Sequence, residues 1–195
     1  MLVILVKRGE KDTYTFAGES GQTLLFDSLE YASNINWQVL SPSGSSVFNN
    51  TNISSDRTHV LSETGIYTLT VDGANDAVGN YGFRILDWSS AIPIDLNTTI
   101  YGNFGEGRES DIYQFTATRD THLFFDSKIG NYPDRWSLYN DRGQLISGNG
   151  YLSSDFEFTL PATDNYTLYL SGNDNVNNDY SLKLLLLNGS IFHSI

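Results

Sequence analysis

The sequence of 195 residues contains no cysteine, one methionine and only four prolines. The absence of cysteine excludes disulfide bonds, thiolate metal sites and a cysteine nucleophile, but it does not fix the compartment. Basic residues are also scarce: 11 Lys and Arg stand against 23 Asp and Glu, which gives a formal net charge of −12. Phosphate backbones would repel such a chain, so we do not expect nucleic acid as a partner.

Long apolar runs and helical periodicity are also missing. No apolar stretch is long enough for a membrane span, and the opening MLVILV is too short for the core of a signal peptide. Aromatic and β-branched residues instead alternate with polar ones, and clusters of Gly, Asn, Asp and Ser separate these stretches. This pattern is typical of strands joined by turns, so the sequence predicts an all-β fold.

The chain repeats itself at a shift of 99 residues, without a gap, from Glu10 to Leu86. LLFDSLEYASNINW, which ends at Trp37, recurs as LFFDSKIGNYPDRW, which ends at Trp136. A period of this length is too long for a solenoid and suits a domain with its own core. We therefore predict two tandem β-sandwich, jelly-roll-like domains, residues 1–90 and 91–195, joined around Asp87–Thr98.

Period-two alternation indicates which side chains face each core. In the first copy these are Tyr14, Phe16, Leu24, Phe26, Trp37, Val39, Tyr67, Leu69, Val71, Tyr81, Phe83 and Ile85. We expect Asp27 and Ser28 to end a strand and the stretch from Ser28 to Trp37 to be a variable loop. The repeated Trp37 and Trp136 are expected in the cores rather than on a binding surface.

The two copies differ in what precedes them. AIPIDLNTTIYGNF leads into the second copy, whereas MLVILVKRG leads into the first, which therefore lacks the counterpart of Ile92–Leu96 as an opening strand. The tail NGSIFHSI runs past Leu187, with Ile191 aligned to Ile92, as in a segment of a longer array. Because open sheet edges recruit strands, we expect self-association through the edge left on the first copy.

Several motifs follow one another in the first copy: GEKDTYTF, GQTLLFDS, W-x-x-x-x-P-x-G, L-x-x-T-G-I-Y-T-L-T-V and GNYGFRILD. In this order they resemble the bacterial pre-peptidase C-terminal domain, in the tandem form of large bacterial surface and calcium-associated proteins. The second copy departs from the pattern at Asp141, in place of Pro, and at Asp164, in place of Gly, both at turns. The resemblance implies a non-catalytic β-sandwich, and some relatives bind Ca²⁺ or insoluble polymers such as collagen.

We predict a non-catalytic extracellular or cell-surface module of a longer exported protein, which acts as a spacer, adhesion or polymer-binding unit. The alternative is an accessory C-terminal domain pair of a secreted hydrolase, such as a protease, that aids folding or substrate targeting. Expected partners are neighbouring repeats of the same protein and a polysaccharide or extracellular matrix protein.

Enzyme signatures are absent from the sequence. G-x-S-x-G, H-E-x-x-H and P-loop patterns do not occur, and none of the three histidines recurs in the other copy, so we expect them on the surface. The repeated carboxylates, Asp12 with Asp111 and Asp27 with Asp126, adjoin core aromatic residues. We expect them to accept backbone hydrogen bonds at strand ends rather than to form a glycosidase pair.

Candidate ligand-binding residues lie outside the shared core. They are Tyr31, Tyr132, Tyr151 and Trp88. No cofactor is required, but two loops concentrate oxygen donors, GNDNVNND (172–179) and DGAND (72–76). Candidate Ca²⁺ ligands are Asp72, Asp76, Asp174 and Asp179. Neither loop has the spacing of an EF-hand or of a glycine-rich nonapeptide, and Asn and Asp also favour turns, so both readings stay open.

If these loops bind Ca²⁺, calorimetric titration of the protein should release a saturable heat, and Ca²⁺ should raise the melting temperature. Mg²⁺ serves as the control cation because it demands a tighter octahedral shell. A flat Ca²⁺ titration together with an unchanged melting temperature would contradict the calcium prediction.

Overall fold

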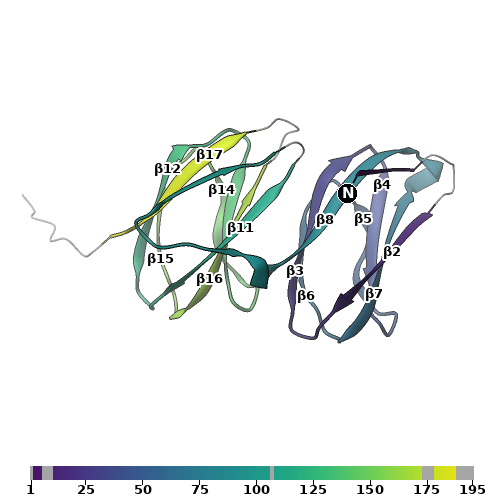
Figure 1. The fold of residues 1–195 in the computed structure, drawn as a ribbon, viewed down its shortest axis with the longest axis horizontal. Coiled ribbons are helices and arrows are strands. Elements are labelled where there is room, and N and C mark those ends of the chain that lie inside the picture. The colour runs from purple at the N-terminus through teal and green to yellow at the C-terminus, as the bar shows by residue number, and fades with distance from the viewer. Residues whose placement is uncertain (1, 6–10, 106–107, 173–177, 188–195) are drawn as a thin grey trace, which may run out of the picture. The chain divides into compact units, whose positions relative to one another are not determined.

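The computed structural model of the protein describes residues 2–5, 11–105, 108–172 and 178–187 (Figure 1). The prediction of an all-β fold is confirmed: the described residues form strands, turns and two short 3-10 helices, η1 (Ala74–Asp76) and η2 (Trp88–Ser90). The chain divides into two compact units, residues 1–90 and 91–195.

The described part of the first unit forms eight strands. They are β1 (Leu2–Leu5), β2 (Lys11–Gly18), β3 (Thr23–Tyr31), β4 (Ile35–Leu40), β5 (Ser46–Asn52), β6 (Arg57–Val60), β7 (Gly65–Gly73) and β8 (Gly79–Asp87). Two four-stranded antiparallel sheets result, in the orders β1-β8-β3-β6 and β2-β7-β4-β5. Apart from the β4–β5 hairpin, successive strands belong to alternate sheets, so the core lies between them.

The second unit repeats this plan with one addition. Its strands are β9 (Ile92–Pro93), β10 (Thr99–Asn103), β11 (Ser110–Ala117), β12 (His122–Ile129), β13 (Arg135–Asn140), β14 (Leu145–Tyr151), β15 (Phe156–Thr159), β16 (Asp164–Ser171) and β17 (Asp179–Leu186). The sheet orders are β10-β17-β12-β15 and β14-β13-β16-β11-β9. Asp12 lies opposite Val71 between β2 and β7, and Asp111 lies opposite Leu170 between β11 and β16, at the same shift of 99 residues.

The alternating aromatic residues fill the two cores. Trp37 is 1% exposed and Trp136 is 2% exposed, which confirms that the repeated tryptophans are core residues. Phe26 packs edge-on to Trp37, with ring centroids 6.3 Å apart, whereas Phe125 stacks on Trp136 at 4.8 Å. The same residue types therefore pack with different ring geometry in the two units.

The prediction that Asp27 and Ser28 end a strand is wrong. Both residues are buried inside β3, which continues to Tyr31 past a bulge between Ser28 and Glu30. β3 pairs with β8 at Asp27 and Ser28, so the strand continues through these polar residues. A local sequence pattern does not reveal this long-range pairing. The expected loop before Trp37 consequently shrinks to residues 32–34.

A partly buried chain of hydrogen bonds joins the two sheets of the first unit. Tyr81 on β8 donates its hydroxyl to Oδ2 of Asp12 on β2 at 2.5 Å, and its oxygen lies 2.7 Å from the hydroxyl oxygen of Tyr14. Burial, followed by the hydrogen bond to Asp12, raises the pKa of Tyr81 far above its usual value. The hydroxyl therefore stays protonated and keeps donating.

The second unit contains the same chain at the corresponding positions. Tyr180 on β17 donates to Oδ2 of Asp111 at 2.5 Å, and its oxygen lies 2.6 Å from that of Tyr113. Burial, followed by the charge of Asp111, raises the pKa of Tyr180 in the same direction. We call these two arrangements the inter-sheet tyrosine chains.

Replacing Tyr81 with Phe should lower the free energy of unfolding by about 1–3 kcal/mol, because the Asp12 carboxylate loses a buried donor. Urea denaturation measures this change. Tyr101→Phe is the matched control, since Tyr101 is 77% exposed and should tolerate the loss of its hydroxyl. Equal stability of the two variants would show that the chain contributes nothing to folding.

Alkaline pH should destabilise the protein. The folded state keeps protons on Tyr81 and Tyr180 that the unfolded chain releases near pH 10, so this stability is present below about pH 10 and falls as the pH rises further. Urea melts between about pH 8 and about pH 11 measure the slope. Tyr180→Phe should make it shallower, and an unchanged slope would contradict the assignment.

Candidate functional site

The repeated carboxylates are bound by neighbouring side chains. Oδ2 of Asp27, which is fully buried, accepts a hydrogen bond from Nε of Arg84 at 2.6 Å. Asp126 in the second unit forms an ion pair with Lys128 at 2.6 Å. With Asp12 and Asp111 in the inter-sheet tyrosine chains, each of the four repeated carboxylates has a side-chain partner.

The expectation that all histidines lie on the surface is wrong for His59. Its ring is half-buried and stacks on Phe48 with centroids 5.2 Å apart, and burial, followed by the charge of Arg57, lowers its pKa. His122 is exposed and lies 3.5 Å from Glu157. His193 lies outside the described residues.

The candidate Ca²⁺ ligands do not come together within the described residues. Asp72 forms an ion pair with a lysine at 2.9 Å, and Asp76 is exposed in η1. Asp179 accepts a hydrogen bond from Asn103 at 2.7 Å, while Asp174 lies outside the described ranges. Across the described part of the chain, no group of three or more His, Asp or Glu side chains could hold a metal ion, so Ca²⁺ binding stays a prediction.

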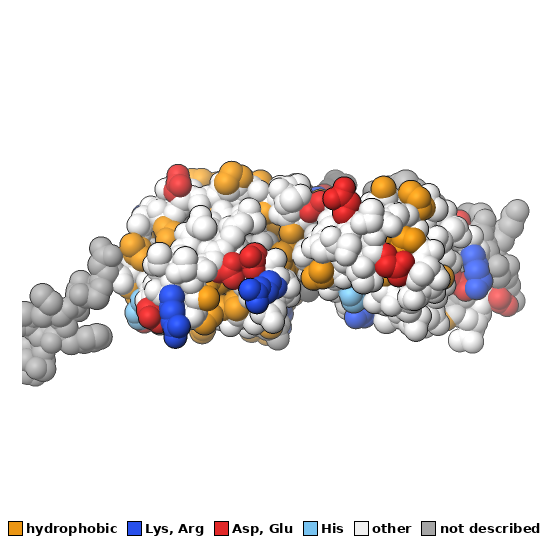
Figure 2. All heavy atoms as spheres, turned by 90° about the horizontal axis from the view of Figure 1, so that it is seen from below, with side chains coloured by type: hydrophobic (Ala, Val, Ile, Leu, Met, Phe, Trp, Pro, Cys, Tyr) orange, Lys and Arg blue, Asp and Glu red, His pale blue; other side chains and the backbone are white. Residues whose placement is uncertain are grey.

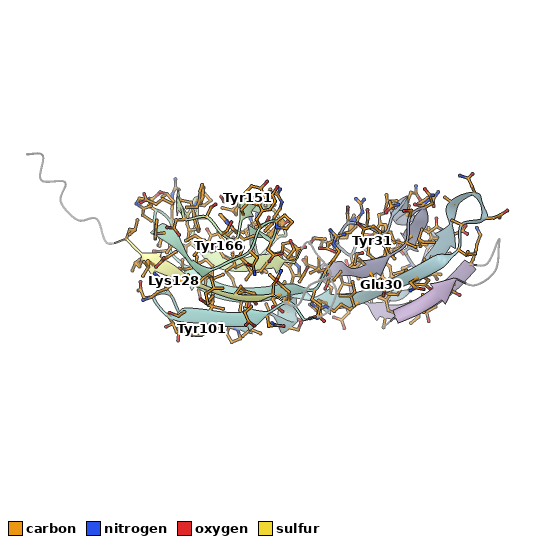
Figure 3. All side chains as sticks on the ribbon, turned by 90° about the horizontal axis from the view of Figure 1, so that it is seen from above. Glu30, Tyr31, Tyr101, Lys128, Tyr151 and Tyr166 are labelled. Atoms are coloured by element: carbon orange, nitrogen blue, oxygen red, sulfur yellow. The ribbon has the colours of Figure 1, made fainter. Side chains whose placement is uncertain are left out.

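The candidate aromatic residues occupy different environments. Trp88 is only 5% exposed in η2, so the prediction that it is available for contact is wrong. Tyr31 is exposed at the end of β3 in the first unit (Figure 3). Tyr132, which is 71% exposed, and Tyr151 both belong to the second unit.

Tyr132 and Tyr151 form one cluster with an arginine that the sequence did not single out. Their ring centroids lie 4.9 Å apart at an interplanar angle of 45°, and the guanidinium carbon of Arg135 lies 4.3 Å above the Tyr151 ring. Arg135 begins β13 and pairs directly with Tyr151 on β14, while Tyr132 lies in the connection between β12 and β13. We call Tyr132, Arg135 and Tyr151 the aromatic cluster.

The pairing of β13 with β14 explains why these residues meet. Residues directly opposite each other on antiparallel strands project from the same face, so a long Arg135 side chain reaches the Tyr151 ring. Ring stacking on one side leaves Tyr132 largely open to solvent. The only sequence signal for the cluster was the aromatic character of its two tyrosines.

The corresponding positions of the first unit are polar. Ser33, Asn36 and Asn52 stand where the second unit has Tyr132, Arg135 and Tyr151. Beside them lies a hollow of about 220 Å³ on β2, β4, β5 and β7. Its polar lining consists of Lys11, Asn36, Gln38, Asn50, Thr70 and Asp72. We call this feature the polar hollow.

Strand irregularity contributes to the shape of the polar hollow. Trp37 pairs with Thr51 and Val39 pairs with Phe48, so the β5 strand has an additional residue opposite Gln38. The lining offers amide, hydroxyl and paired ionic groups but no exposed ring. The two units therefore present different chemistry at equivalent places on one fold.

In the view of Figure 2 the acidic and basic side chains are scattered, and no extended patch of one sign covers that face. Within the described residues, no helix has the length and apolar character needed to cross a membrane.

No family model matches the chain, and no curated protein matches it. Among solved structures, the pre-peptidase C-terminal domain of a collagenase from Bacillus anthracis is similar at 24% identity. The alignment covers 49% of this chain and 94% of that domain, with a TM-score of 0.38. A periplasmic inhibitor of g-type lysozyme from Aeromonas hydrophila is similar at 13% identity. The alignment covers 48% of this chain and 95% of the inhibitor, with a TM-score of 0.38.

The secreted serine protease VesC from Vibrio cholerae is similar at 8% identity. The alignment covers 95% of this chain and 50% of the protease, with a TM-score of 0.32. These identities and TM-scores assign neither a family nor an activity. The case for a function therefore rests on the residues of this chain.

Proposed function

We propose that the chain is a non-catalytic, extracellular β-sandwich module that binds a neutral polysaccharide through the aromatic cluster of its second unit. The observation that carries this proposal is the ring contact between the exposed Tyr132 and the partly buried Tyr151, with Arg135 over the Tyr151 ring. The resemblance of the sequence to pre-peptidase C-terminal domains supports an exported module without catalysis.

The aromatic cluster has the chemistry of a stacking site. Tyrosine offers a large, rigid ring face and a hydroxyl, and it loses little conformational entropy on binding. The Arg135 guanidinium fixes the orientation of Tyr151 and supplies donors for hydroxyl groups beside it. A sugar ring, with one apolar face and a rim of hydroxyls, matches this combination.

The overall charge favours a neutral polymer over an acidic one. A net charge of −12 repels uronic acids and sulfated chains at long range, and a single arginine in the cluster does not offset that repulsion. Matrix protein as the ligand is the competing outcome. The module could belong to an array of repeats or accompany a hydrolase domain. In either case the surface proposed to bind the polymer is the same, and only the attached domains differ.

Replacing either Tyr132 or Tyr151 with Ala should weaken retention on insoluble neutral polysaccharides by about tenfold or more, because each ring supplies stacking area at the centre of the contact. Depletion assays with a panel of insoluble polysaccharides, acidic polysaccharides and collagen measure the affinity and identify the class of polymer.

Two variants control for the general effect of removing surface groups. Tyr101→Ala removes an equally exposed tyrosine from β10, in the other sheet of the second unit, and Figure 3 shows Tyr101 and Tyr151 on opposite sides of that unit. Asn52→Ala alters the position of the first unit that corresponds to Tyr151. Retention on collagen alone, or equal losses in the control variants, would overturn the proposal.

A further inference from the structure

One sheet edge is covered in the second unit by a short parallel strand. β9 lies beside β11, with Ile92 opposite Tyr113 and Pro93 opposite Gln114. The backbone N–H of Ile94 donates to the carbonyl oxygen of Gln114 at 2.8 Å. The backbone of Gln114 thus faces away from β16 and toward the covering segment.

The covering segment also closes the core. Ile94 and Leu96 pack against the core of the second unit, next to its buried aromatic residues. Tyr113 and Phe115 on β11 are only 5% and 4% exposed. In the second unit, residues 92–96 therefore cover both the backbone of β11 at the sheet edge and the apolar side chains beside it.

In the first unit, the described residues place no strand on the corresponding edge. β1 takes the place of β10, since Leu2 pairs with Gly82 as Tyr101 pairs with Ser181, at the shift of 99 residues. Among the described residues, however, no strand pairs with β2 on the side away from β7.

The side chains of β2 are less buried than the corresponding side chains of β11. Tyr14 and Phe16 are only half-buried, although they correspond to the buried Tyr113 and Phe115. β2 contains no proline, and its two charged side chains, Lys11 and Asp12, lie at its start, so the edge from Thr13 to Ala17 has neither of these usual protections. Thr15, which corresponds to Gln114, presents its backbone N–H and carbonyl at this edge.

The chain carries a segment that suits this edge. Residues 190–195 read SIFHSI and stand 99 residues after AIPIDL at 91–96, the segment that contains β9. Ile191 and Ile195 correspond to Ile92 and Leu96, whereas His193 stands in the place of Ile94. The segment follows β17 as residues 91–96 follow β8.

We propose that residues 190–195 of a second copy of this chain add to the free edge of β2 as a parallel strand, in the manner of β9 on β11. The contact is heterologous, since tail and edge belong to different units of the chain, and it joins copies head to tail. The edge from Thr13 to Ala17, with half-buried Tyr14 and Phe16, gives the added strand both backbone partners and an apolar face to cover.

Sedimentation velocity over a concentration series tests the proposal on the full chain. The weight-average sedimentation coefficient should rise with concentration and should stay at the monomer value after deletion of residues 188–195. Ile191→Asp combined with Ile195→Asp should have the same effect, because a charge then replaces each apolar contact. Association that survives both changes would overturn the proposal.

Substitutions on β2 test the other side of the contact. Thr15→Pro removes a backbone N–H from the free edge and should weaken association by about tenfold, whereas Thr15→Val keeps the N–H and should associate like the parent. Should Thr15→Pro unfold, a labelled SIFHSI peptide gives the second measurement. It should bind the tail-deleted chain, measured by fluorescence anisotropy, and a scrambled peptide should not; equal binding of the two peptides would contradict the proposal.

Discussion

A tyrosine hydroxyl inside a hydrocarbon core must be bound, and this requirement ties together the two sheets of each unit. Tyr81 and Tyr180 each belong to one sheet of their unit, while the carboxylate that accepts the hydrogen bond belongs to the other sheet of the same unit. If the sheets slid or moved apart, a buried hydroxyl and a partly buried carboxylate would lose their partners. The tyrosine chains thereby fix the sheet registry on which every surface feature depends.

That fixed registry allows the outer faces to differ freely. At equivalent places the second unit has the aromatic cluster, and the first unit has the polar hollow with its Lys11–Asp72 ion pair. The side chains of a strand alternate between faces, so an outward position can change without disturbing an inward one. The two units therefore share one architecture, because their core residues are the same in type. Their outer faces carry different side chains and so offer different binding chemistry.

Much of the fold was readable because side-chain alternation reports directly on burial. Most of the alternating aromatic residues, with Trp37 and Trp136 among them, lie in the cores as predicted, while Tyr14 and Phe16 are only partly buried. Local patterns failed where long-range pairing outweighed them. Asp27 and Ser28 look like a strand end, yet pairing with β8 carries β3 past both, and Trp88 looks like a surface residue, yet it is buried in η2.

The sequence by itself determined the all-β class, the core positions and the recurrence at 99 residues, because each depends on spacing along the chain. Only the tertiary structure decided which polar and exposed groups meet. Tyr132, Tyr151 and Arg135 come together because β13 pairs with β14, and Asp12 finds Tyr81 across two sheets. Such contacts depend on strand order and register, which are set by packing of the whole sandwich rather than by neighbouring residues.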